Sequence, residues 1–144
     1  MDKLTYVRLL NENDADIPQL LKIHQLPETA CYISTTDTYF YYVTNTENVY
    51  YFKVYDNDKL VASIHIEKIN SVLSMSILVF PEYQRMGYGS KIIKDIQDDV
   101  LAFDYDTIEV SIDERNTASL QLFKNAGFIH TSKEDELLYF TYKR

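Results

Sequence analysis

The feature that most constrains the fold is a glycine loop between two apolar segments. This loop is Gln84-Arg85-Met86-Gly87-Tyr88-Gly89, and it holds two of the three glycines of the chain. Residues 74–80 before it are an apolar run that predicts a buried strand. After it, apolar residues spaced as one helix face follow at Ile92, Ile93, Ile96 and Val100. Strand, loop and helix together predict an α/β fold, with loop amides and a helix N-terminus facing an anion.

The order of residues in the loop excludes two common phosphate-binding motifs. A Walker A loop requires Gly-Lys-Ser/Thr, whereas this chain has Gly89-Ser90-Lys91. A dinucleotide-binding loop requires a third glycine where this chain has Ile92. A tight turn without a ligand stays open as the alternative interpretation.

Composition narrows the class of protein. A length of 144 residues predicts one domain over residues 1–144, and a net charge of -8 argues against nucleic-acid or anionic-membrane partners. The sequence holds no apolar run of membrane-spanning length and no signal-peptide pattern at Met1-Asp2-Lys3-Leu4, so we expect a cytoplasmic protein. The single cysteine, Cys31, argues against a disulfide framework, and we expect no metal.

Hydrophobic periodicity predicts the element order β-α-(α)-β-β-β-α-β-α-β-β, a mixed sheet with helices on both faces. A first helix is expected to end at about His24, with Asp14 or Asp16 as its N-cap. Two further helices are expected over residues 90–102 and 116–126, and Gly127 is expected to end the second of these in a left-handed conformation. Residues 27–47 are ambiguous. The tyrosine-rich residues 39–42 and 50–51 are expected to be strand residues in the core, and lining an apolar pocket is the alternative. Strands are expected over residues 5–10, 49–55, 60–69, 74–80, 107–112, 128–131 and 137–142.

Two motifs together resemble those of the GNAT superfamily of N-acetyltransferases. The first is Val79-Phe80-Pro81-Glu82-Tyr83-Gln84 with the glycine loop that follows, and the second is Asn116-x-x-Ser119-x-x-Leu122-Phe123-x-x-x-Gly127-Phe128. With the end of the apolar strand that precedes them, they span residues 77–128. The resemblance implies a GNAT-like fold and acetyl-CoA as cosubstrate. It also implies acetyl transfer to a primary amine by direct attack in a ternary complex.

The resemblance also implies which residues bind acetyl-CoA. The strand backbone at residues 77–79 would run beside the pantetheine, which requires the sheet to splay between residues 74–80 and 107–112. An amide near Leu78 or Val79 would polarise the thioester carbonyl. The Asn116 amide would hold pantetheine or water, although a plain helix cap is an open and compatible alternative. The implied cofactor-binding residues are Ile77, Leu78, Val79, Gln84, Arg85, Met86, Gly87, Tyr88, Gly89, Ser90, Asn116, Ser119 and Phe123.

The catalytic residues are where this chain departs from the family pattern. Phe123 stands where many relatives carry a tyrosine general acid, residues 72–80 contain no carboxylate, and Ser111 replaces a glutamate of another branch. The general acid is therefore unassigned. Candidates for the base are Glu109, His65 and Glu67, each of which has a solvated surface group as its alternative interpretation.

Acceptor and partners follow less directly from the sequence. The acidic composition and the tyrosines of residues 39–51 suggest a cationic or partly aromatic amine, either a small molecule or a peptide. A homodimer is a common arrangement among relatives. Two other functions stay open: an acyl-CoA-binding sensor that has lost catalysis, and an interaction module that binds no CoA.

Overall fold

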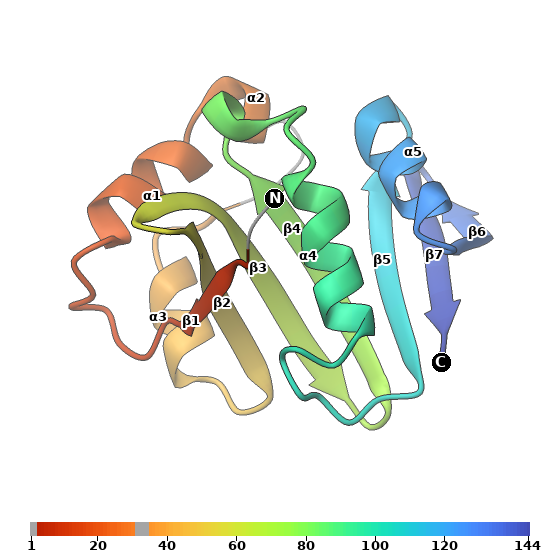
Figure 1. Ribbon diagram of the computed structural model, residues 1–144, viewed down its shortest axis with the longest axis horizontal. Coiled ribbons are helices and arrows are strands. Elements are labelled where there is room, and N and C mark those ends of the chain that lie inside the picture. Colours follow the sequence, from red (N-terminus) through yellow and green to blue (C-terminus); the bar gives the residue numbers. More distant parts are fainter. Residues whose placement is uncertain (1–2, 31–34) are drawn as a thin grey trace.

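The computed structural model describes residues 3–30 and 35–144, so the single cysteine, Cys31, lies outside the described residues. Its seven strands form a sheet with the order β1-β2-β3-β4-β5-β7-β6 (Figure 1). Neighbouring strands are antiparallel except β4 and β5, which are parallel. This is the expected mixed sheet. The strands are β1 (Thr5–Arg8), β2 (Val49–Asp56), β3 (Lys59–Ile69), β4 (Val72–Val79), β5 (Thr107–Asp113), β6 (Ile129–Glu134) and β7 (Leu137–Lys143).

Helices cover both faces of the sheet, as expected. On one face, α4 (Tyr88–Gln97) and α5 (Thr117–Asn125) pack over the larger core, which includes Ile64, Ile92 and Ile108. On the other, α1 (Ile17–His24) and α3 (Tyr39–Asn45) pack over a smaller core. A one-turn helix, α2 (Pro27–Ala30), lies near the glycine loop (Figure 1). None of the helices within residues 3–30 and 35–144 is long and apolar enough to cross a membrane.

The prediction that residues 39–42 form a strand is wrong. They begin α3, which buries Phe40 and Val43, three residues apart on one helix face. The preference of aromatic residues for strands is weak, and packing of this face against the sheet overrides it. Tyr50 and Tyr51 do lie in a strand, β2, as predicted, and Tyr51 is buried.

Two predicted helix boundaries also differ from the structure. The helix expected over residues 90–102 begins two residues earlier and ends at Gln97, and the chain then turns through positive φ angles at Asp99 (66°) and Ala102 (57°). Asp16 occupies the N-cap position of α1, but its side chain makes no cap hydrogen bond. Asp14 and Asp16 instead bind the buried Lys53 ammonium at 2.7 and 2.9 Å, because a buried cation requires paired anions.

The sheet splays between β4 and β5, as the family resemblance implies. These strands pair at only three positions, from Val72 with Thr107 to Ser74 with Glu109. Beyond Ser74 on β4 and Glu109 on β5, the two strands no longer pair with each other, although β4 continues to Val79 and β5 continues to Asp113. The separation leaves backbone edges of both strands facing a gap.

Candidate functional site

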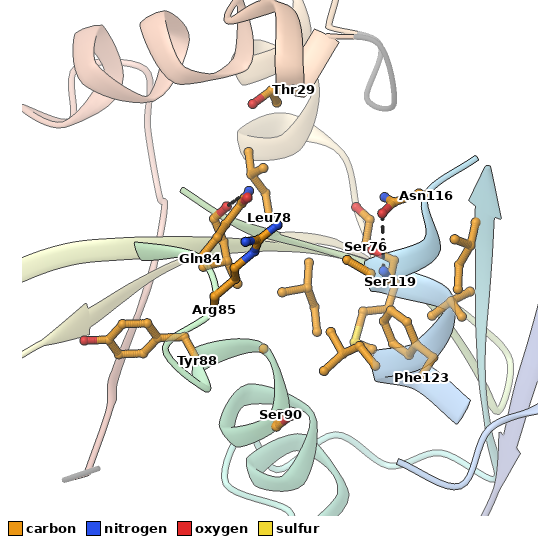
Figure 2. Close-up of a pocket in the computed structure, with 18 of the residues that line it drawn as sticks. Thr29, Ser76, Leu78, Gln84, Arg85, Tyr88, Ser90, Asn116, Ser119 and Phe123 are labelled. Carbon is orange, nitrogen blue, oxygen red and sulfur yellow. Dashed lines mark hydrogen bonds between the residues drawn. The ribbon is translucent and has the colours of Figure 1, made fainter. Parts of the chain in front are cut away.

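A cleft of about 690 Å³ occupies the gap between β4 and β5 (Figure 2). Its walls come from segments far apart in the sequence: α2, β4, the glycine loop, the start of α4, β5 and α5. Side chains on both faces of β4 line it, including Met75 and Ile77 on the α4 face and Ser76 and Leu78 on the opposite face. The cleft therefore passes through the splayed sheet from the glycine loop toward Thr29 of α2.

The glycine loop forms a concave backbone at the mouth of the cleft. Arg85 and Gly87 have positive φ angles of 63° and 88°, and Gly87 is the N-cap of α4. The first α4 hydrogen bond runs from the Lys91 amide to the Gly87 carbonyl, so the amides of residues 88–90 precede the helical ladder. Together with the positive end of the helix dipole, these amides can hold an anion.

Gly89 is glycine for a different reason from Gly87. A Cβ at Gly89 would lie 2.8 Å from Cδ2 of Leu122, a residue of α5 that also lines the cleft. The side chain of Leu122 would have to shift to accommodate any larger residue. Gly89 thus permits the close approach of α4 and α5 beneath the cleft.

Two side-chain hydrogen bonds hold the loop in place. The Gln84 Nε2 group donates to the Val79 carbonyl at 3.1 Å, which joins the loop to the end of β4. The Tyr88 hydroxyl donates to Oδ2 of Asp56, the last residue of β2, at 2.5 Å. That hydrogen bond raises the pKa of Tyr88, which keeps the phenol protonated. The Tyr83 ring packs edge-on against Tyr88 at 6.2 Å.

Helix α5 forms the facing wall. Asn116 is its N-cap, and Oδ1 of Asn116 accepts a hydrogen bond from the Ser119 amide at 3.2 Å (Figure 2). The cap predicted for Asn116 is confirmed, and the same side chain lines the cleft. Phe123 also lines it and packs edge-on against Phe128 at 5.0 Å. A phenyl ring has no proton to donate, so this wall supplies no general acid at position 123.

The three candidate bases lie beside the cleft rather than in its lining. Glu109 pairs with Ser74 at the last rung before the strands separate, and Glu67 pairs with Ser74 from the other side. His65 lies directly opposite Ser76, which lines the cleft. Because directly paired residues share a sheet face, all three side chains lie on the α2 and α3 side. His65 Nε2 is 2.8 Å from Glu67 Oε2.

Most of the predicted cofactor-binding residues meet in this cleft. All of them line it except Met86, whose side chain is 58% exposed and is not part of the lining. Sequence reasoning missed Glu28 and Thr29 of α2, which lie in the ambiguous segment and belong to no motif. It also missed Val110 and Ile112, whose alternating pattern indicated only a core strand. Within the described residues no His, Cys, Asp and Glu group of three or more is placed to hold a metal.

Comparisons with known proteins agree with this geometry. A family model described as "Acetyltransferase (GNAT) family" matches residues 17–128. A domain from Methanocaldococcus jannaschii DSM 2661 has a similar fold, with a TM-score of 0.83 at 16% sequence identity and 99% of both chains covered. Comparison with curated protein sequences gives no significant match.

Two further similar structures are of N-acetyltransferases. Campylobacter jejuni N-acetyltransferase PseH, in complex with acetyl coenzyme A, has a TM-score of 0.78 at 13% identity, with 99% of both chains covered. The spermidine N-acetyltransferase of Vibrio cholerae, in complex with CoA and spermine, has a TM-score of 0.81 at 14% identity. That match covers 97% of this chain and 95% of the other. At such low identities the likeness is one of fold.

Proposed function

Because the chain belongs to the acetyltransferase (GNAT) family, whose cosubstrate is acetyl-CoA, we propose that it acetylates a primary amine by direct attack within a ternary complex. The observation that carries this proposal is the cleft that passes through the splayed sheet. Such a cleft offers an anion cradle at one end and an approach for a second substrate at the other. The catalytic domain is proposed to span residues 1–144.

The residues of the cleft fit acetyl-CoA. The amides of residues 85–90 are suited to the pyrophosphate, and the Arg85 guanidinium adds a positive charge beside them. The unpaired edge of β4 at residues 77–79 is suited to the amide groups of pantetheine, which would run alongside as an added strand. Asn116, Ser119 and Phe123 would contact the thioester end from α5.

In the proposed reaction, the amine nitrogen attacks the thioester carbonyl from the α2 side of the sheet. The C–N bond forms, the C–S bond breaks and CoA leaves as a thiolate, which solvent can protonate because position 123 carries no acid. An amide of Leu78 or Val79 would stabilise the developing oxyanion. The amine attacks in its neutral form, after its ammonium has released one proton to solvent. As the amide forms, the nitrogen loses one further proton, for which Glu109, His65 and Glu67 are the candidate acceptors on this face.

A cationic acceptor is favoured by charge. The net charge is -8, and Glu67 and Glu109 flank Ser74 on the face from which the acceptor would approach. The Vibrio cholerae relative, a spermidine N-acetyltransferase, is consistent with a small amine of this kind. A peptide amine is the other acceptor class proposed, and a cytoplasmic location and a homodimer stay predictions.

The first test is the thermal shift of the protein with acetyl-CoA. Ligand at about a hundred times its Kd would stabilise the fold by about 2.7 kcal/mol, which corresponds to about 5–10 °C. Gly87→Trp would abolish the shift by filling the cradle, whereas Met86→Trp, on the exposed neighbouring residue, would keep it. Both variants need native far-UV circular dichroism spectra. A folded wild type with no shift would contradict the cofactor assignment.

Phe123 and Ser111 favour a second candidate function. Both positions lack the proton-transfer groups that the family pattern implies, so the chain would be an acyl-CoA-binding sensor without catalysis. A panel of polyamines, amino acids and peptides, assayed for CoA release, separates the two functions. CoA release with any of these amines supports the transferase. A thermal shift with acetyl-CoA but no CoA release across the panel would support the sensor.

A further inference from the structure

Three side chains form a hydrogen-bonded chain next to the α2 end of the cleft. The Tyr39 hydroxyl lies 2.6 Å from Nδ1 of His65, and Nε2 of His65 lies 2.8 Å from Oε2 of Glu67. The other oxygen of Glu67, Oε1, accepts a hydrogen bond from the Tyr42 hydroxyl at 3.0 Å. The chain thus joins α3 to β3 through polar atoms alone.

The chemistry of these groups fixes the direction of the hydrogen bonds. An ionised carboxylate can only accept, so the proton between Glu67 and His65 belongs to Nε2. In a neutral imidazole the other nitrogen, Nδ1, is then an acceptor, and the Tyr39 hydroxyl must donate to it. His65 is therefore held in one tautomer, with its basic nitrogen directed at a phenol.

The surroundings hold the Tyr39 phenol in place. Its ring packs edge-on against Phe40 at 5.2 Å and against Tyr51 at 6.0 Å. Burial raises the pKa of Tyr39, so the phenol is protonated and able to donate. The His65 side chain is 18% exposed, which leaves it partly reachable by water.

The position of the chain links it to the cleft. His65 lies directly across from Ser76, whose side chain lines the cleft on the same sheet face. Leu78 also lines the cleft and packs against the smaller core, to which Tyr39 belongs. Directly paired Cα atoms in an antiparallel sheet are about 4.5–5.5 Å apart, so His65 is the immediate cross-strand neighbour of a residue that lines the cleft.

We infer that Tyr39, His65 and Glu67 form a proton relay that serves the acceptor end of the cleft, an inference that rests on the proposed function. As the C–N bond forms, the attacking nitrogen gives its proton through water to Tyr39 Oη. The proton of Tyr39 moves to Nδ1 of His65. The resulting imidazolium is paired with Glu67 and returns the proton to solvent. Glu67 acts as a positioning residue, since its carboxylate accepts hydrogen bonds from His65 and Tyr42 and does not line the cleft.

Several titratable groups face His65 and enter any interpretation of its pH dependence. They are Tyr39 and Tyr42 from α3, Tyr51 from β2 and Glu67 from its own strand. His24 of α1 is also nearby, and its pKa is lowered first by burial and second by the charge of His65. The paired residue on β4, Ser76, is uncharged.

The relay is tested with Tyr39→Phe and His65→Gln, with Tyr42→Phe as the matched control. Each substitution removes one polar function of the network, but Tyr42 lies off the proton path. We expect kcat for CoA release with the best amine of the panel to fall about 10²-fold or more in the first two variants, as for loss of a general base. The thermal shift with acetyl-CoA would be unchanged in all three. The dependence of kcat on pH would change in His65→Gln and stay as in the wild type in Tyr42→Phe.

A second measurement detects the hydrogen bonds of the relay and does not require catalysis. Nitrogen-15 NMR of histidine-labelled protein would show His65 protonated at Nε2 only, and Tyr39→Phe would shift the Nδ1 resonance. If the wild type acetylates an amine, and Tyr39→Phe and His65→Gln have the same kcat and pH profile as the wild type, the relay is wrong. The proposed transferase activity would still hold. A wild type that binds acetyl-CoA but acetylates no amine would instead overturn the proposed function.

Discussion

The Asn116 side chain carries an acceptor and a donor group, and capping uses only the acceptor. Its Oδ1 atom binds the Ser119 amide at the start of α5, while the side chain as a whole lines the cleft. A capping role and a ligand-binding role can therefore be separated by chemistry at this residue. Aspartate caps helices as well as asparagine does but has no amide donor.

We expect Asn116→Asp to retain the thermal stability of the wild type and to bind acetyl-CoA more weakly, because the Nδ2 donor is lost and a negative charge is added. Asn116→Ala would lose about 1 kcal/mol of unfolding free energy as well. Chemical denaturation and calorimetric titration measure the two effects. Full acetyl-CoA affinity in Asn116→Asp would show that the side chain is only a cap.

Among the secondary-structure elements, the end of β2 supports the start of α4. The two are far apart in the sequence, and the hydrogen bond from Tyr88 to Asp56 joins them. Tyr88 is the first residue of α4, directly after the N-cap Gly87. The end of β2 thus orients the amides that are proposed to hold the pyrophosphate.

We expect Tyr88→Phe and Asp56→Asn to weaken acetyl-CoA binding several-fold, because each change removes or weakens a hydrogen bond that holds the loop in its binding conformation. A hydrogen bond to a charged group contributes about 1.5–3 kcal/mol to stability, and only part of that loss falls on binding. Binding of S-acetyl-pantetheine, which lacks the pyrophosphate, would change little. Tyr83→Phe, which keeps the ring packing against Tyr88, is the matched control. Equal weakening for both ligands would argue that the hydrogen bond acts on the whole cleft and not on the cradle.

Prediction from the sequence succeeded where a pattern is local. The glycine loop, the Asn116 cap and the alternating strand over residues 107–112 each specify their own backbone, and the structure confirms all three. The splay of the sheet was implied by family resemblance, since no residue pattern along one strand reports where its neighbour departs. Likewise, the hydrogen bond from Tyr88 to Asp56 joins residues 32 positions apart, and neither sequence neighbourhood indicates it.

Prediction failed where several weak preferences compete. The tyrosines of residues 39–42 favour a strand by type, but the burial of Phe40 and Val43 against the sheet selects a helix. The contribution of α2 to the cleft was missed because Glu28 and Thr29 belong to a four-residue helix without periodicity. Of the network of Tyr39, His65 and Glu67, the sequence indicates only His65 and Glu67, as two separate candidate bases, because residue type favours a strand at Tyr39.

For the molecule as a whole, the smaller core contains a buried histidine that responds to pH. His24 is 2% exposed and has hydrogen bonds of 3.0 Å to the hydroxyls of Thr35 and Tyr51. Burial, with the charge of His65 as a second cause, lowers the pKa of His24 to about 4. The folded state therefore contains neutral His24 across a pH range in which the unfolded state is protonated.

We expect the unfolding free energy to be highest above about pH 6.5 and to fall as the pH decreases, with a loss of about 2 kcal/mol by pH 5 from His24 alone. His24→Gln, which keeps polar partners for both hydroxyls, would remove this part of the slope. Asp113, whose pKa is lowered to about 2 by hydrogen bonds from Arg115, loses its contribution only at more acidic pH. Urea denaturation of both proteins at pH 7.5 and pH 5 measures the difference. An equal loss of unfolding free energy between pH 7.5 and pH 5 in both proteins would show that the acid sensitivity arises from groups other than His24.

The three-rung contact between β4 and β5 also determines how the protein exchanges hydrogen with solvent. Backbone amides of β4 beyond Ser74 that point into the gap have no partner strand on that side, so they would exchange quickly in the free protein. A ligand whose own amides pair with this edge would slow their exchange, while the rungs from Val72 to Ser74 would change little. Deuterium uptake at a few amides of one strand would thus report occupancy of the cleft, whether or not any acetyl group is transferred.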